Sequence, residues 1–170
     1  MTQMLVLGLG NPILTDDGVG ILVVREVQSR LLSSPAVSAG EVGRGSWTFA
    51  EASVGGLRLL EVLTGHERAI LVDAIQTPGG APGDVYRLTV GDLRSSRHSG
   101  STHDLTLAGA LALGRALGMA LPEDDAMVII AIEVVDVLTF GEGCTPLVEA
   151  AIPKVVQLVM DEIKEEQVRG

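Results

Sequence analysis

The chain has few of the residues on which many functions depend. Its 170 residues include a single cysteine, Cys144, and aromatic residues make up 2%. A single cysteine excludes an internal disulfide and a metal site built from cysteines alone. The scarcity of Phe, Tyr and Trp means that Leu, Val, Ile and Ala must build most of the hydrophobic core.

Basic residues are also scarce. Twelve Lys and Arg stand against 22 Asp and Glu, which gives a net charge of -10. This balance argues against a nucleic-acid backbone and against an anionic membrane surface as partners. The richest apolar runs, 108–121 and 126–138, contain charged residues and are too short to cross a bilayer. No signal peptide is evident at the start, so we expect a soluble cytoplasmic protein.

What the chain does have is enough apolar material for one compact domain over residues 1–170. Hydrophobic residues make up 46% and charged residues 20%, which is typical of a globular protein. The predicted strands cover residues 4–9, 47–53, 69–75 and 126–134, and the predicted helices cover 17–32, 55–63, 104–117 and 146–166. Strands that alternate with helices predict an α/β three-layer sandwich, with a twisted, mostly parallel sheet and helices on both faces.

The remaining segments are less regular. Residues 84–90 alternate with a period near two, which favours a strand near the sheet edge. Residues 33–46 read as a loop with a short strand around 36–42, and the polar residues 91–101 as an exposed loop. Pro153 is expected to kink or restart the last helix, because proline lacks the N–H that a helix interior uses.

The opening stretch, residues 4–20, organises the rest of the chain. An apolar strand runs into two glycines and an Asn-Pro turn, which deliver Asp16 and Asp17 to the start of a helix. Ligands of open α/β proteins bind beyond the carboxyl ends of parallel strands. Thr15 or Asp16 is suited to cap the helix, which leaves the second acid for chemistry. Two acids at this place suggest a metal or proton-transfer site.

Asp73 and His103 extend this set. Asp73 directly follows an apolar run, and a buried carboxylate there must be paired, protonated or metal-bound. If the first and third strands are neighbours, Asp17 and Asp73 emerge at the same sheet edge. His103 precedes an apolar helix and could point over that edge. Two carboxylates and an imidazole suit a borderline divalent ion with open positions for substrate. The simpler alternative is a capping histidine and two structural acids.

Other motifs are weaker. Gly8-x-Gly10 resembles a dinucleotide loop but lacks its third glycine, because position 13 is Ile. Cys144 lies in a turn with no histidine close in sequence, so a small turn residue is favoured over a nucleophile. His66 and His98 read as solvent-exposed.

Four segments together match a known pattern. They are Gly-Leu-Gly-Asn-Pro-Ile-Leu-Thr-Asp-Asp-Gly-Val-Gly at 8–20, Leu-Val-Asp-Ala at 71–74, His-Asp-Leu at 103–105, and Thr145-Pro146 with Glu149. These segments run in order over nearly the whole chain. Through them the chain resembles the hydrogenase maturation proteases. These endopeptidases trim the C-terminal extension from the large subunit of nickel–iron hydrogenases. The resemblance implies a twisted sheet sandwiched by helices.

The resemblance also implies a site and a substrate. Asp17, Asp73 and His103 would be the catalytic and metal-binding residues, and Asp16 a supporting or capping residue. The substrate would be a large-subunit precursor that already carries nickel, so the nickel comes with the substrate and the resting enzyme is metal-free. The nickel or a carboxylate could activate the water, and both possibilities stay open. An aspartic-protease dyad is not required, because a metal between two acids removes the reason to share a proton.

Some features leave alternatives open. Glu-Ala-Ser-Val-Gly-Gly at 51–56 departs from the Gly-Gly-Thr type segment of the family, so which hydrogenase is processed is undetermined. A peptidyl-tRNA hydrolase also opens with Gly-Leu-Gly-Asn-Pro, but should carry a basic surface. A non-catalytic maturation chaperone could check nickel with the same ligands, and a family member could act outside hydrogenases. A monomer is the default expectation, because a transient grip on a large precursor needs no symmetry.

Overall fold

A five-stranded sheet forms the centre of the molecule. The computed structural model describes residues 2–33, 45–53, 57–95 and 102–169. The strands are β1 (Thr2–Leu9), β2 (Gly45–Ala52), β3 (Arg68–Ile75), β4 (Val85–Leu88) and β5 (Met127–Glu133), in the spatial order β2-β1-β3-β5-β4. All neighbours are parallel except β4, which pairs antiparallel with β5 at one edge. The mostly parallel sheet and the edge position of residues 84–90 are therefore confirmed.

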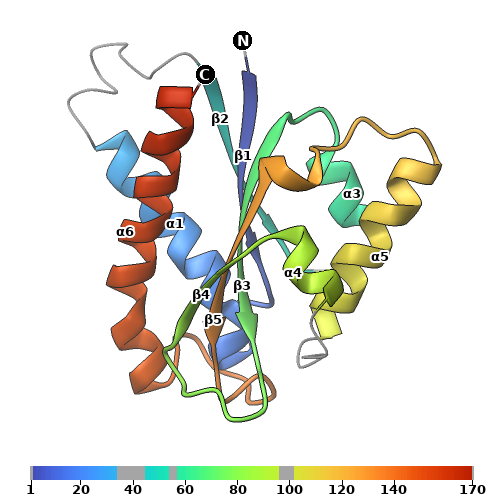
Figure 1. Cartoon of the computed structure of the whole chain (residues 1–170). Helices are drawn as coiled ribbons and strands as arrows, with labels where there is room; N and C mark the ends of the chain where they lie inside the picture. The colour runs from blue at the N-terminus through green and yellow to red at the C-terminus, as the bar shows by residue number, and fades with distance from the viewer. Residues whose placement is uncertain (1, 34–44, 54–56, 96–101, 170) are drawn as a thin grey trace.

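Helices cover both faces of this sheet (Figure 1). Helices α1 (Val19–Leu32) and α6 (Pro146–Arg169) lie on one face, and α3 (Leu57–Leu63), α4 (Val90–Ser95) and α5 (Thr102–Ala116) on the other. Two short 3-10 turns, η1 (Thr15–Gly18) and η2 (Asp124–Ala126), precede α1 and β5. This is the predicted three-layer sandwich.

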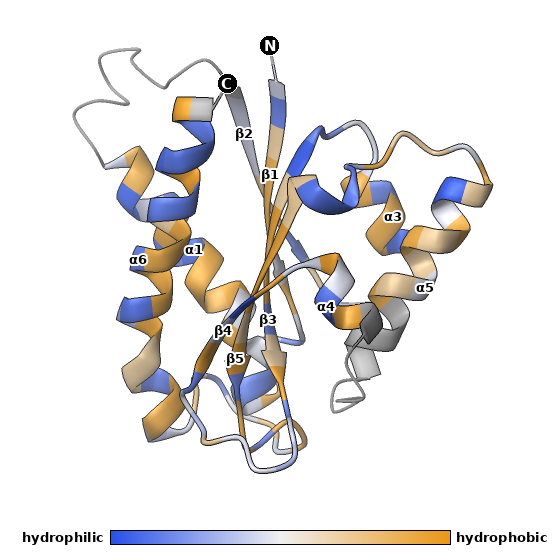
Figure 2. Cartoon of the chain, viewed as in Figure 1, coloured by the Kyte–Doolittle hydropathy of each residue, from blue (hydrophilic) through white to orange (hydrophobic). Residues whose placement is uncertain are grey.

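The central strands are apolar because both of their faces are covered. Val6, Ile70 and Val72 pack in the cluster beneath α1 and α6. Leu5 and Leu71 pack in the cluster on the opposite side. Figure 2 shows the resulting apolar interior of the sheet. Successive residues of a strand point to opposite faces, so the strand registers decide which layer each residue enters.

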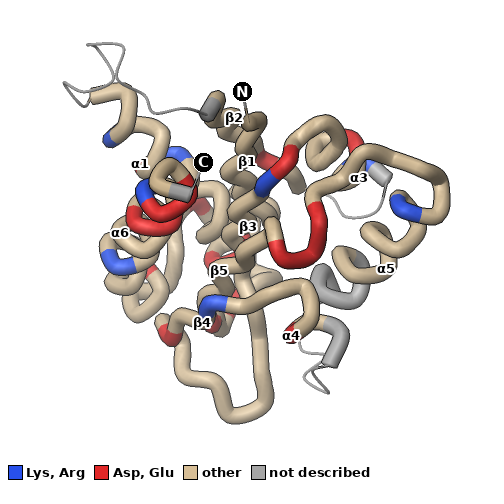
Figure 3. Tube along the Cα trace, turned by 45° about the horizontal axis from the view of Figure 1, so that its top comes forward, with Lys and Arg blue, Asp and Glu red and all other residues tan. Residues whose placement is uncertain are grey.

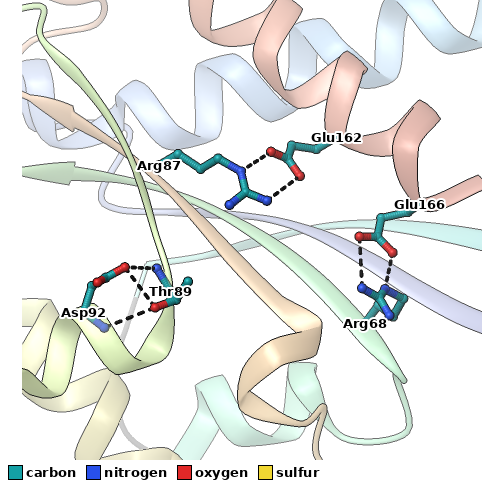
Figure 4. A network of polar contacts seen from close by, with 6 residues as sticks. All are labelled: Arg68, Arg87, Thr89, Asp92, Glu162 and Glu166. Atoms are coloured by element: carbon teal, nitrogen blue, oxygen red, sulfur yellow. Dashed lines mark hydrogen bonds and ion pairs between the residues drawn. The ribbon is translucent and has the colours of Figure 1, made fainter. Parts of the chain in front are cut away.

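Part of the segment predicted as an exposed loop is helical. Residues 91–95 belong to α4, so the loop prediction is wrong there. The backbone N–H and the hydroxyl of Thr89 both donate to Asp92 Oδ2, at 2.7 and 2.9 Å (Figure 4). Asp92 N–H donates back to the Thr89 hydroxyl at 3.2 Å. This reciprocal capping box starts the helix. Residues 96–101, like the predicted short strand at 36–42, lie outside the described residues.

Two details of the predicted helices are also wrong. The first helix was expected from Asp17 with Thr15 or Asp16 as its cap, but α1 begins at Val19 after η1. Gly18 is its N-cap, and no side chain caps it. Of the two alternatives at Pro153, a restart of the helix is wrong, because α6 is continuous from Pro146 to Arg169, and a kink stays a prediction.

Ion pairs fix α6 to the sheet. Arg87 pairs with Glu162, and Arg68 with Glu166 (Figure 4). Both carboxylates are buried, whereas half of the Arg87 side chain is exposed. The hydrogen bonds that Arg87 donates to Glu162 raise the pKa of Arg87 despite partial desolvation. Figure 3 shows acidic and basic residues along the same helix.

Of the helices described, none is long and apolar enough to span a membrane.

Candidate functional site

Glycines let α1 begin directly over the ends of β1 and β3. A Cβ on Gly20 would overlap the carbonyl oxygen of Val72 and lie 2.7 Å from that of Leu9. A Cβ on Gly8 would lie 2.8 Å from the Gly20 carbonyl oxygen. No larger residue fits at this helix–sheet contact without movement of the backbone. The start of α1 is thereby held at the carboxyl edge of the two strands.

The turn before α1 folds back on itself. Gly10 has φ +129°, and a Cβ there would overlap the carbonyl oxygen of Asp17. The backbone N–H of Asn11 donates to Asp17 Oδ2 at 2.8 Å. This bond orients the Asp17 carboxylate at the sheet edge. Asp17 is half-buried, so its side chain remains accessible to a ligand.

Asp73 lies at the same edge. β1 and β3 are parallel neighbours with Gly8 opposite Val72, which confirms that the first and third strands are adjacent. The turn η1, which contains Asp17, contacts β3. The Asp73 side chain is 4% exposed, and its Oδ1 accepts the N–H of Ala74 at 2.8 Å. By strand alternation it points to the face of Leu71, which α5 helps to cover.

The histidines differ in position. His103 lies in the first turn of α5, on the face to which Asp73 points, but its side chain is outside what the structure describes. Figure 1 shows α5 beginning toward the end of the sheet at which β3 ends. His98 lies outside the described residues. His66 precedes β3 at the opposite end of the sheet. The sequence had indicated a solvent-exposed side chain, but His66 is half-buried.

The two adjacent acids have different roles. Asp16 is fully buried. Its Oδ1 accepts the N–H of Thr145 at 2.7 Å, and its Oδ2 accepts the Thr145 hydroxyl at 2.9 Å. Oδ2 also accepts the N–H groups of Val135 and Asp136, at 3.2 and 3.0 Å. These donors occupy its acceptor capacity. Among the described residues, one hydrogen bond reaches the Asp17 carboxylate, so Asp17 is the acid with capacity for a ligand.

The sequence patterns did not single out a third buried acid at this edge, Glu133. Glu133 ends β5 and is 2% exposed. Its carboxylate accepts the backbone N–H of Thr77 at 2.7 Å and the Thr77 hydroxyl at 2.8 Å. A Cβ on Gly80 would overlap it. The signal was available, because Glu133 follows an apolar run as Asp73 does. These contacts give Glu133 the role of an anchor for the turn between β3 and β4.

The loop at 135–145 is built onto the opening turn. The hydroxyl of Thr15 donates to the carbonyl of Thr139 at 2.6 Å, and Leu14 forms an isolated bridge with Phe140. Within the loop, the N–H groups of Thr139 and Leu138 donate to Asp136 Oδ1. These bonds, and above all the one from Thr139, hold the pKa of the Asp136 carboxyl below its usual range.

Cys144 closes this loop and is half-buried. Its thiol lies 3.9 Å from the carbonyl oxygen of Thr15. Burial raises the pKa of Cys144 to about 12, and the negative charges of Asp16 and Glu149 add to this effect. Because the thiolate is the nucleophilic form, this environment supports the interpretation of Cys144 as a packed turn residue.

A complete metal site is not seen among the side chains that the structure describes. In that part of the chain, no three His, Cys, Asp or Glu side chains lie close enough to hold an ion. The His103 side chain is not among them. The set of Asp17, Asp73 and His103 as metal ligands therefore stays a prediction.

Comparisons with known proteins agree on one family. The sequence model described as hydrogenase maturation protease matches residues 21–162, a range that includes Asp73 and His103 and begins after Asp17. The hydrogenase 2 maturation protease of Escherichia coli strain K12 is 27% identical over 169 residues, which are 99% of this chain and 94% of that protein.

Solved structures show the same fold. The hydrogenase maturating endopeptidase HybD from E. coli has a TM-score of 0.74 and 24% identity, over 97% of this chain and 94% of that one. The [NiFe] hydrogenase maturation protease HybD from Thermococcus kodakarensis has a TM-score of 0.66 and 22% identity, over 95% and 99%. Because the family model matches most of the chain, the protein belongs to the hydrogenase maturation protease family and is a peptidase.

Proposed function

We propose that the protein is an endopeptidase that removes the C-terminal extension of a nickel–iron hydrogenase large-subunit precursor after nickel insertion. Family membership supports the reaction class and the kind of precursor. The observation that supports the site is that Asp17 and Asp73 lie at the same edge of the sheet. The acidic composition, with a net charge of -10, disfavours a peptidyl-tRNA substrate.

Asp17 is the acid that meets the nickel first. It is half-buried, and the N–H of Asn11 fixes one of its oxygens. An ionised carboxylate has about four acceptor positions, so the hydrogen bond leaves room for a cation brought by the substrate. Asp16 plays no part in this contact, because its oxygens hold the loop at 135–145.

Asp73 and His103 complete the ligand set. Asp73 is nearly inaccessible to water and points to the side that α5 helps to cover. His103 belongs to the first turn of that helix. Carboxylate and imidazole ligands suit a borderline ion such as Ni²⁺. Two oxygens and one nitrogen leave coordination positions for the precursor's own ligands, so the ion can join the two proteins during recognition.

This arrangement explains selection of the loaded precursor. The nickel is part of the substrate, and the three protein ligands bind it when the precursor presents it. Binding then places the peptide bond before the C-terminal extension at the sheet edge, where an attacking water must be positioned. A precursor without nickel lacks this contact and is cleaved slowly.

Cleavage of purified precursor tests the proposal. Nickel-loaded and nickel-free precursors are incubated with wild type and with Asp17→Asn, Asp73→Asn and His103→Ala, and release of the extension is followed by mass spectrometry. We expect wild type to cleave the loaded form. Each variant should lose at least about 100-fold in rate, since even the partners of metal ligands contribute about 10–100-fold.

Matched controls separate the site from general effects. Asp125→Asn removes an exposed acid on η2, at the amino end of β5, and His66→Ala removes a histidine at that end of the sheet. Both should cleave as wild type does. Unchanged cleavage by folded Asp17 and Asp73 variants would place the chemistry elsewhere. Binding of the loaded precursor by wild type without cleavage would favour the nickel-checking chaperone.

A further inference from the structure

Large apolar side chains are exposed around the candidate site. Phe140 is 77% exposed, although it is one of two phenylalanines in the chain. Leu138 is 83% exposed, and Val135 and Ile13 are 57% and 53% exposed. We call these four residues the apolar rim. Single exposed apolar residues are ordinary, but several on adjoining segments mark an interaction surface.

The two segments of the apolar rim are held together by backbone bonds. Leu14 bridges Phe140, and the N–H of Gly141 donates to the carbonyl of Ile13 at 3.0 Å. The hydroxyl of Thr15 donates to the carbonyl of Thr139 at 2.6 Å. The exposed side chains are thus presented on a fixed backbone. A preformed surface loses little entropy when a partner binds.

The apolar rim is continuous with the candidate site. Ile13 lies just before η1, the turn that contains Asp17, and the N–H of Val135 donates to Asp16. Figures 1 and 2 show both loops at the end of the sheet where β3 and β5 end, with apolar residues in them. A polypeptide that brings its nickel to Asp17 would approach the same end of the sheet as these side chains. This continuity favours the substrate as the molecule that binds the apolar rim.

Charge indicates the chemistry of the contact. With a net charge of -10, the protein repels an acidic partner surface at long range. The apolar rim offers attraction that does not depend on charge. We propose that the apolar rim is the surface that grips the large-subunit precursor, through an apolar segment next to its C-terminal extension. This inference rests on the proposed function for the identity of the occupant.

The test pairs rim variants with equally exposed apolar controls. Leu138→Ser and Phe140→Ser are compared with Leu32→Ser and Leu117→Ser, whose parent side chains are 69% and 64% exposed at the opposite end of the molecule. Binding of nickel-loaded precursor is measured by biolayer interferometry, and KM and kcat by release of the extension. The variant that combines Leu138→Ser with Phe140→Ser should raise Kd and KM at least about 10-fold, as the loss of an interface hot spot does. Its kcat should change much less. The controls should match wild type.

The outcomes separate the two proposals. If wild type cleaves the precursor and the rim variants keep its Kd and KM, the rim proposal is overturned and the proposed function stands. If wild type binds without cleaving and the rim variants lose binding, the rim proposal stands and the protease function fails. Absence of wild-type binding overturns both. A wild-type dimer in sedimentation that the rim variants convert to monomer would assign the surface to a second copy and overturn the rim proposal.

Discussion

The carboxylate of Asp16 accepts both the backbone N–H and the side-chain hydroxyl of Thr145, at 2.7 and 2.9 Å. The two residues are 129 positions apart in the sequence. Their contact joins the opening turn to the residue that precedes α6, and Asp16 is fully buried there. This relationship makes Asp16 the anchor of the edge at which Asp17 lies.

Replacement of Asp16 by Ala should destabilise the protein by about 3 kcal/mol, because buried N–H groups of the loop lose a charged acceptor. Urea unfolding followed by circular dichroism measures the loss. Asp17→Asn is the matched control and should change the free energy of unfolding by less than about 1 kcal/mol, since Asn11 can still donate to the amide oxygen. Equal effects of the two changes would contradict the division of roles.

Gly20→Ala should also be destabilising, by at least about 2 kcal/mol, because the new methyl group meets backbone oxygens of β1 and β3. Gly109→Ala in α5 is the control. A Cβ at Gly109 has no heavy atom within 4 Å, so helix propensity should stabilise that variant by up to about 1 kcal/mol. Thermal melting of the two variants and of wild type measures these changes in stability. Stabilisation by Gly20→Ala would mean that α1 does not pack this closely on the sheet.

The raised pKa of Cys144, about 12, predicts an unreactive thiol. At pH 8 about one thiol in ten thousand is then ionised, and the thiolate is the reactive form. Ellman's reagent should label the native protein slowly at pH 8 and faster as the pH rises. In guanidinium chloride, Cys144 should react within seconds to minutes. The Asp16→Asn variant should react faster than wild type, because it removes a negative charge beside the thiol. Rapid labelling of native wild type would refute the burial argument.

The Arg87–Glu162 pair should show an asymmetric response. Arg87→Met leaves a carboxylate that is 10% exposed without its cation, and should cost about 2–3 kcal/mol. Glu162→Gln leaves a guanidinium that is 50% exposed and can turn to water, so the cost should stay below about 1 kcal/mol. Guanidinium unfolding curves of the two variants give the comparison. A larger loss for Glu162→Gln would show that the carboxylate is better solvated than its burial indicates.

The layered fold and the shared edge of Asp17 and Asp73 could be predicted because they depend on local patterns. The apolar runs at 69–75 and 126–134 have the composition of strands covered on both faces, and β3 and β5 coincide with them within a few residues. Helix α4 was missed, since the polar composition of 91–95 concealed the capping box at Thr89 and Asp92.

The sequence by itself determined the strands, the turn chemistry of 8–20, and an acid after a buried strand at Asp73. Only the tertiary structure showed that the oxygens of Asp16 are taken by donors at 135–145, which leaves Asp17 as the acid of the adjacent pair with capacity for a ligand. Asp16 and Asp17 are chemically equal, and their difference comes from donors at 135–145 that the chain brings back after 119 residues or more. The same holds for Glu133, whose partner Thr77 lies 56 positions away. Hydrogen bonds across such separations depend on the packed fold, because no local pattern encodes which donors will meet a carboxylate.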